Sequence, residues 1–240
     1  MATKPGFQRF AGFRSLPYRS GIIYNFFNDC LYDRYEKYST IAKLIGNGSK
    51  KVFDLPCGTG FLTRFLSHST TYTGFDLNHR FLKKMYKDWH NGKIKLKKLI
   101  LKQYNIFDFD KYPKAPQDVI VFCDILHHIY DPQTNKHIEL VENAKKHANK
   151  IILCEPVAVK PQDVHAYALV GKTTMFITKF FPERAMKVID FFFADNDGIN
   201  SYHKRASWQH DEKSLREFFK SLGFNKILKL TDDFIGVWEK

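Results

Sequence analysis

Polar residues of the kinds that bind ligands and move protons recur at the ends of apolar runs in this sequence. Asp54 lies in the run 51–55 and precedes Gly58 and Gly60, which flank Thr59. The other members of the set follow later apolar runs: Asp76, Asn105, Asp124, His127, His128 and Glu155. Carboxylates accept hydrogen bonds and hold cations, glycines let a ligand approach the backbone, and histidines exchange protons near neutral pH. The set therefore predicts a ligand site capable of acid–base chemistry.

Apolar runs typical of strands alternate with segments of helical spacing along most of the chain. The predicted strands are residues 51–55, 71–76, 99–104, 118–123, 150–154, 226–230 and 234–238. Helices are expected at residues 22–45, from 61 onward, at 78–89 with Asn78 as N-cap, at 133–148 and at 214–222. This alternation predicts an α/β fold with a doubly wound, mostly parallel sheet. Ligands of such sheets bind beyond the carboxyl ends of the strands, where the polar set maps.

The loop between Asp54 and Gly60 favours a cationic ligand over a dinucleotide. A dinucleotide-binding loop wants a third small residue, and this sequence has Thr63 at that position. The carboxylate of Asp54 would repel a pyrophosphate but suits a positive charge. An ordinary strand-to-helix turn is the alternative that the loop alone leaves open.

With these residues the sequence resembles the class I S-adenosylmethionine-dependent methyltransferase family. Asp54-Leu-Pro-Cys-Gly-Thr-Gly60 looks like the family's first motif, Asp76 like its ribose-binding acid, and the segment 118–128 like its fourth motif. The resemblance spans roughly residues 50–155 and resumes at 213–240. It implies a Rossmann-like sheet of seven strands with an antiparallel last strand. It also implies S-adenosyl-L-methionine as cofactor and S-adenosyl-L-homocysteine as product.

The same resemblance implies a set of cofactor-binding residues: Asp54, Cys57, Gly58, Gly60, Asp76, Leu77, Asn105, Ile106, Cys123 and Asp124. In this assignment Asp76 accepts hydrogen bonds from both ribose hydroxyls, and Asp54 favours the ammonium group. Asn105 lies near the adenine, where many family members have Asp. The bare backbone of the glycine loop accommodates the methionyl part.

Candidates for a catalytic base are histidines at two places in the chain. His127 and His128 follow the fourth predicted strand, although histidines there often only line the cofactor pocket in the family. His203 lies in a polar cluster with Tyr202, and both are candidate catalytic residues; His165 is a further histidine of the same region. A base helps only if the acceptor loses a proton. The fourth motif has Cys123-Asp-Ile-Leu126 where family members that methylate exocyclic amines of bases or glutamine amides carry Asn/Asp-Pro-Pro-Tyr. Its Leu-His-His style resembles the branch that methylates small molecules, quinone precursors and lipids.

Three regions are expected around the site. Residues 1–48 form a basic, aromatic segment and helices covering the site, residues 49–155 and 213–240 form the cofactor-binding core, and residues 156–212 form an insertion over the acceptor. The insertion is rich in aromatic residues and balances 7 basic against 7 acidic residues, which suits an apolar acceptor better than nucleic acid. These aromatic residues are also sufficient to build a small core of the insertion itself.

Charge and composition leave several partners open. Residues 1–110 contain 19 Lys and Arg against 8 Asp and Glu, which is 11 of the net charge of +13. This excess fits RNA, an anionic membrane contacted through the N-terminus, or a solvated lysine-rich face. No apolar run has the ~18 residues of a membrane span, no signal-peptide core is present, and the four cysteines are scattered. A cytoplasmic protein with reduced thiols, no metal site and, as an alternative, peripheral membrane contact is therefore expected.

The sequence thus predicts a methyltransferase acting on an O or N atom of a hydrophobic small molecule or lipid-like acceptor. One alternative is an RNA or protein methyltransferase that docks through the basic N-terminal half. Another is a non-catalytic subunit with the cofactor fold. No oligomeric state is favoured.

Overall fold

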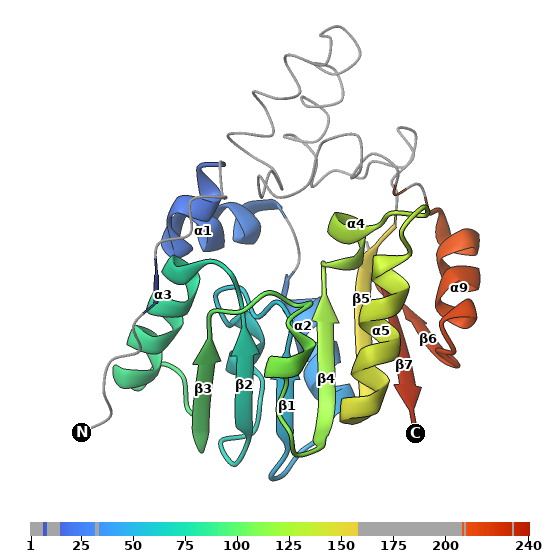
Figure 1. Cartoon of the computed structure of the whole chain (residues 1–240). Helices are drawn as coiled ribbons and strands as arrows, with labels where there is room; N and C mark the ends of the chain where they lie inside the picture. Colours follow the sequence, from blue (N-terminus) through green and yellow to red (C-terminus); the bar gives the residue numbers. More distant parts are fainter. Residues whose placement is uncertain (1–6, 9–14, 32–33, 158–207, 209, 232) are drawn as a thin grey trace, which may run out of the picture.

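A seven-stranded sheet forms the centre of the molecule. The computed structural model describes residues 7–8, 15–31, 34–157, 208, 210–231 and 233–240. The strand order is β3-β2-β1-β4-β5-β7-β6, and β7 runs antiparallel to both of its neighbours (Figure 1). The strands are β1 Lys51–Asp54, β2 Thr71–Phe75, β3 Lys98–Lys102, β4 Gln117–Cys123, β5 Ala148–Pro156, β6 Lys226–Lys229 and β7 Asp233–Glu239. The predicted α/β fold with a mostly parallel sheet and a reversed last strand is confirmed.

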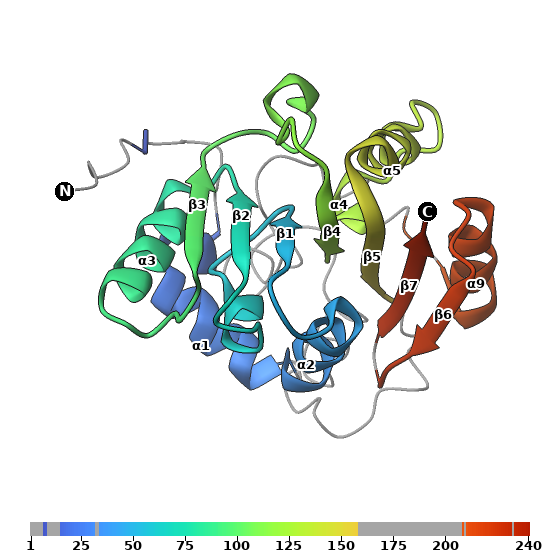
Figure 2. The ribbon, with the colours of Figure 1, turned by 90° about the horizontal axis from the view of Figure 1, so that it is seen from below.

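Helices cover both faces of the sheet. The α-helices are α1 Gly21–Leu31, α2 Arg34–Ile45, α3 His79–His90, α4 Leu126–Ile129, α5 Lys136–His147 and α9 Glu212–Ser221. Short 3-10 helices are Pro17–Arg19, Phe61–Arg64 and Phe109–Lys111. Helices α2 and α3 lie on one face and α5 and α9 on the other (Figure 2). Asn78 caps α3 as predicted, because its side chain accepts a hydrogen bond from the N–H of Arg80 at 3.1 Å.

Alternate strand residues supply a separate hydrophobic core on each face. Strand residues that pack toward α5 and α9 include Phe53, Phe75, Ile120, Phe122, Ile151, Leu153 and Phe234. Those that pack toward α2 and α3 include Val52, Tyr72, Val119, Val121, Ile152, Ile235 and Val237. Because both faces are buried, the central strands are apolar throughout, as the sequence indicated.

The prediction of a helix after Gly60 is wrong about the length of that helix. Only Phe61–Arg64 is helical, and it is a single 3-10 turn. Ser67 and Ser69 follow, and the Ser67 hydroxyl accepts from the N–H of Ser69 at 3.3 Å. Serine side chains that bond the nearby backbone compete with helix formation. The apolar residues after Gly60 therefore pack on the sheet from a tight turn instead of a full helix.

Strand order reverses between β1 and β4, and the carboxyl ends of the parallel strands meet at one edge of the sheet. Helices α1 and α4 lie at this edge (Figure 1). In open α/β sheets this is where ligands bind. Among the residues that the structure describes, no helix is both long and apolar enough to cross a bilayer.

Gly236 of β7 allows close packing of α9. A Cβ atom at Gly236 would lie 2.8 Å from the ring of Phe219 and 3.1 Å from that of Phe224. Gly236→Ala is therefore expected to lower the free energy of unfolding by about 1–3 kcal/mol, measured by urea denaturation. Phe219→Leu in the Gly236→Ala background should recover part of this loss by making room. An unchanged free energy of unfolding in Gly236→Ala would contradict the packing described.

Candidate functional site

The glycine loop leaves β1 at Asp54 and turns sharply at two glycines. Gly58 and Gly60 have φ angles of 52° and 75°, values that disfavour residues with a Cβ atom. A Cβ atom at Gly58 would meet nothing within 4 Å, whereas one at Gly60 would lie 2.6 Å from the sulfur of Met85. Gly60 is therefore required by the packing of α3. Gly58 leaves the backbone open on its outer side, as a bound ligand needs.

Asp76 links the end of β2 to the glycine loop. Its Oδ2 accepts the N–H of Gly58 at 2.9 Å, and its Oδ1 accepts the N–H of Asn78 at 2.6 Å. Burial raises the pKa of Asp76 to about 6, although both hydrogen bonds oppose the rise. An ionised carboxylate has about four acceptor positions, so two backbone donors leave capacity for donors of a ligand.

Asp54 is a second buried carboxyl group in the same corner. Its Oδ2 accepts a hydrogen bond from the hydroxyl of Tyr72, one strand away on β2. Burial raises the pKa of Asp54 to about 7; the Tyr72 hydroxyl opposes this rise and the charge of Asp76 adds to it. Two carboxyl groups that ionise close to neutral pH thus lie beside one open backbone segment, and a cation binding there would favour their ionised forms.

The other predicted cofactor residues lie at neighbouring strand ends. Cys57 is buried in the loop, and its N–H donates to the carbonyl of Phe75 at 2.9 Å. Leu77 follows β2 and its carbonyl accepts from Gln103 Nε2 at 3.1 Å. Asn105 is exposed after β3, where its Oδ1 accepts the N–H of Phe107 at 3.1 Å, and Ile106 is buried in the core.

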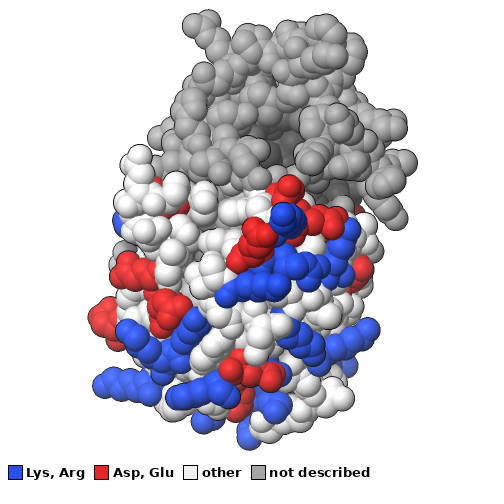
Figure 3. All heavy atoms as spheres, turned by 90° about the vertical axis from the view of Figure 1, so that its right-hand side faces the viewer, with Lys and Arg blue, Asp and Glu red and all other residues white. Residues whose placement is uncertain are grey.

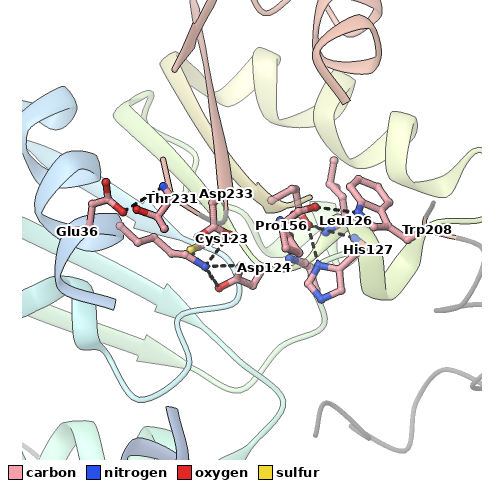
Figure 4. A network of polar contacts seen from close by, with 12 residues as sticks. Glu36, Cys123, Asp124, Leu126, His127, Pro156, Trp208, Thr231 and Asp233 are labelled. Carbon is pink, nitrogen blue, oxygen red and sulfur yellow. Dashed lines mark hydrogen bonds and ion pairs between the residues drawn. The ribbon is translucent and has the colours of Figure 1, made fainter. Parts of the chain in front are cut away.

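Glu155 and His127 form a hydrogen-bonded pair where β5 and β4 end (Figure 4). Glu155 is fully buried; its Oε1 accepts the N–H groups of Ile125 at 2.9 Å and Leu126 at 2.7 Å. Its Oε2 accepts the backbone N–H of His127 at 3.3 Å and lies 2.8 Å from the Nδ1 atom of that ring. A carboxylate that only accepts assigns the proton to Nδ1, which makes Nε2 the basic nitrogen of the neutral ring. Glu155 thus fixes both the orientation and the tautomer of His127.

Trp208 packs against this pair. Its indole Nε1 donates to the carbonyl of Pro156 at 3.0 Å, and its ring centre lies 6.2 Å from that of His127 (Figure 4). His128, the next residue, is buried, and its ring centre lies 4.2 Å from that of His127. The sequence predicts an aromatic insertion over the acceptor at residues 156–212. Of the Phe, Tyr and Trp residues in this insertion, the structure describes Trp208. The candidate catalytic residues Tyr202 and His203, with His165 and most of the expected insertion, lie outside the described residues.

Lys37 is a site residue that the sequence did not indicate. It extends from α2 to the strand-end edge, where its Nζ lies 2.8 and 2.9 Å from the carboxylate oxygens of Asp124 and 3.0 Å from Asp233. Asp124 follows β4 with a φ of 54°, and Cys123 before it is buried. Lys37 lies between Tyr35 and Tyr38 in the sequence, and no pattern there distinguishes it from a lysine exposed to solvent.

Cofactor affinity is expected to depend on pH through the two carboxyl groups of the loop. A cationic ligand binds their ionised forms, so affinity falls as pH drops through about 7 at Asp54 and about 6 at Asp76. Between pH 7.5 and 5.5 the dissociation constant of S-adenosylmethionine should rise at least about tenfold, measured by calorimetry. Asp54→Asn should remove the upper part of this dependence, whereas Asp110→Asn, at an exposed site, should not. A dissociation constant independent of pH in the unaltered protein would contradict this prediction.

Residues 53–150 match the family model described as a methyltransferase domain. No curated protein is significantly similar to the chain in sequence. Among solved structures, the DhpI–SAH complex is 15% identical with a TM-score of 0.54, over 92% of this chain and 91% of that chain. Magnesium protoporphyrin IX methyltransferase (ChlM) from Synechocystis PCC 6803 with bound SAH is 13% identical with a TM-score of 0.52, over 90% and 84% of the two chains. An O-methyltransferase family protein from Burkholderia thailandensis is 12% identical with a TM-score of 0.56, over 96% and 64%. At these identities the likeness is one of fold.

Proposed function

We propose that this chain, as a class I S-adenosylmethionine-dependent methyltransferase, methylates an O or N atom of a hydrophobic or amphipathic small molecule. The observation that carries this proposal is the Glu155–His127 pair at the carboxyl ends of β4 and β5. The pair supplies a group that can accept a proton at this edge of the sheet.

The residues of the loop fit the cofactor. S-adenosylmethionine supplies an electrophilic methyl group on a positively charged sulfonium. Asp76 has acceptor capacity for the ribose hydroxyls, and Asp54 contributes negative charge for the ammonium group. The open side of Gly58 admits the ligand to the backbone. Because the methyl group is already activated, we expect the protein to act mainly by positioning the acceptor.

His127 would act on the acceptor. An O–H or N–H acceptor has to lose its proton as it gains the methyl group, and the Nε2 atom of His127 is the position that takes this proton. The buried carboxylate of Glu155 stabilises the imidazolium that results, as a carboxylate does in other proton-transfer sites. General-base help of this kind contributes about 10²–10⁴-fold to the rate. An acceptor without such a proton would need no base.

The charges around His127 disfavour an acceptor with a negative charge at the reaction centre. Asp124, Glu155 and Asp233 bring three carboxyl groups to this part of the edge, and Lys37 brings one ammonium group. An excess of negative charge attracts a cationic cofactor and repels phosphate groups at the reaction centre. ChlM, which shares the fold, is a methyltransferase of magnesium protoporphyrin IX, a small molecule.

The basic residues are explained in part by the sheet. Its edge strands β3 and β6 carry exposed lysines, Lys98 and Lys102 on β3 and Lys226 and Lys229 on β6. Lysines on edge strands prevent pairing with another chain. On the face beside α9 and β6, acidic side chains lie among the basic ones (Figure 3), and Lys229 pairs with Glu212. Mixed charge of this kind does not favour RNA docking on that face.

One labelling experiment separates the candidates. The protein is incubated with a radiolabelled methyl donor and with separate organic-soluble, RNA and protein fractions of a cell extract. Label in the organic-soluble fraction is expected. Label confined to RNA or protein would favour the alternative acceptors. Cofactor binding without transfer to any fraction would favour a non-catalytic subunit.

A further inference from the structure

Helix α2 places a lysine at the carboxyl ends of the strands. The helix packs on the sheet through Ile41 and Ile45, and one turn earlier Lys37 points toward the end of β4 and the start of β7. Its side chain is 9% exposed, and its Nζ contacts the carboxylates of Asp124, directly after β4, and Asp233, the first residue of β7 (Figure 4). The lysine thus joins three elements that are far apart in the sequence.

The burial of Lys37 is costly unless both carboxylates stay ionised. An unpaired buried charge costs several kcal/mol, whereas an ammonium between two carboxylates is paired on both sides. Burial lowers the pKa of Lys37, but the neighbouring groups, Asp124 first among them, outweigh this and hold that pKa well above its usual value. The ammonium therefore remains charged at neutral pH. It keeps two like charges, Asp124 and Asp233, close together.

Asp124 is the partner that faces the reaction site. Its backbone has a left-handed φ of 54°, which is strained for a residue other than glycine, and its N–H donates to the carbonyl of Cys154 at 3.0 Å. Its side chain is 38% exposed, so the carboxylate is accessible from the strand-end edge while Lys37 holds both of its oxygens. His127 lies close enough to interact with its charge. Asp124 is thus a negative charge beside the proposed base.

We propose that Lys37 is a positioning residue that holds Asp124 ionised and oriented toward the reaction site. This inference rests on the proposed function, in which Asp124 borders the cofactor and His127. Lys37 supplies its positive charge from α2 and not from a strand end, so the site is complete only when α2 is packed on the sheet. Without Lys37, the neighbouring carboxylates would repel each other and Asp124 would take up a proton more readily.

The groups that face Asp124 come from five elements: Lys37 and Tyr38 of α2, Cys123 of β4, Cys154 of β5, Asp233 of β7 and His127 of α4. Burial raises the pKa of Asp124, but Lys37 and His127 oppose it and the net direction is downward. The buried thiols are uncharged, because burial contributes to raising the pKa of both Cys123 and Cys154. Lys37 is thus the residue whose removal should most alter the ionisation of Asp124.

The test compares Lys37→Met with Lys43→Met, which removes the same charge from an exposed position of the same helix. In Lys37→Met, the titration of Asp124 should move to higher pH by about 1–3 units, followed by carboxyl-carbon NMR and assigned with Asp124→Asn. The acid limb of the pH profile of kcat/KM, which His127 sets in the proposed function, should move in the same direction, because His127 then lies beside an Asp124 charge that Lys37 no longer offsets. Lys43→Met should leave both unchanged, and Lys37→Arg should restore most of the activity.

The outcomes separate a positioning role from a structural one. If Lys37→Met is less stable but the Asp124 titration and the pH profile are unchanged, the proposal is overturned. If Lys37→Met does not fold, Lys37→Gln replaces it, and the same two readouts decide. The NMR titration needs no acceptor, so it tests the hold of Lys37 on Asp124 even if the proposed function fails. A shifted titration with an unshifted pH profile would overturn the positioning role and leave the proposed function standing.

Discussion

Asp76→Ala is expected to raise the dissociation constant of S-adenosylmethionine by about 10²–10⁴-fold, measured by calorimetry. The carboxylate would bind two ribose hydroxyls, and each hydrogen bond to a charged group contributes about 1.5–3 kcal/mol. The same carboxylate orders the pocket, because it joins the N–H groups of Gly58 and Asn78. Affinity for S-adenosylhomocysteine should fall equally, since the two molecules share the ribose.

The matched control for Asp76→Ala is Asp110→Ala, which removes a carboxylate from an exposed position. Asp76→Asn is a stricter test of the carboxylate, because its NH₂ group would replace one of the two oxygens that now accept from backbone donors. We expect a loss close to that of Asp76→Ala. A folded Asp76→Ala protein with unchanged affinity for both ligands would remove this corner of the sheet from the cofactor site.

The parts of the site that local patterns encode were predictable. The run from Asp54 to Gly60 combines a strand, an acid and two glycines, and each of these has a local physical reason. Asp76 and the N-cap Asn78 follow from the end of a strand and the start of a helix. The alternation of strands and helices then places these residues at one edge, because parallel strands end on the same side. The structure has them there.

The remaining features depend on tertiary contacts that leave no local pattern. Lys37 reaches Asp124 across 87 residues, and the axial position of α2 on the sheet decides whether it does so. Glu155 was expected at the edge, but its hydrogen bonds to His127 and to the start of α4 depend on how the chain turns after β4. The prediction of a full helix after Gly60 was wrong because serine side chains compete for the backbone hydrogen bonds that a helix needs. A single sequence shows the residues but not these partners.

His127→Gln is expected to lower kcat by about 10²–10⁴-fold while the dissociation constant of S-adenosylmethionine stays within about twofold. Glutamine can still hydrogen-bond but cannot take up a proton, so the loss measures general-base catalysis. The acid limb of the pH profile should disappear in the residual activity. The control is His68→Gln, in an exposed turn before β2, which should leave kcat unchanged.

Glu155→Gln separates the two functions that the buried carboxylate combines. The amide oxygen can still accept from Ile125 and Leu126, but the NH₂ group would face the N–H groups of His127, so the imidazole loses both its counter-charge and its fixed orientation. If His127 is the base, kcat should fall and the acid limb should move to lower pH, because the imidazolium is less stabilised. If His127 only lines the pocket, both variants should instead weaken cofactor binding and leave the pH profile in place. The direction of the acid limb therefore decides whether this histidine moves a proton or fills space.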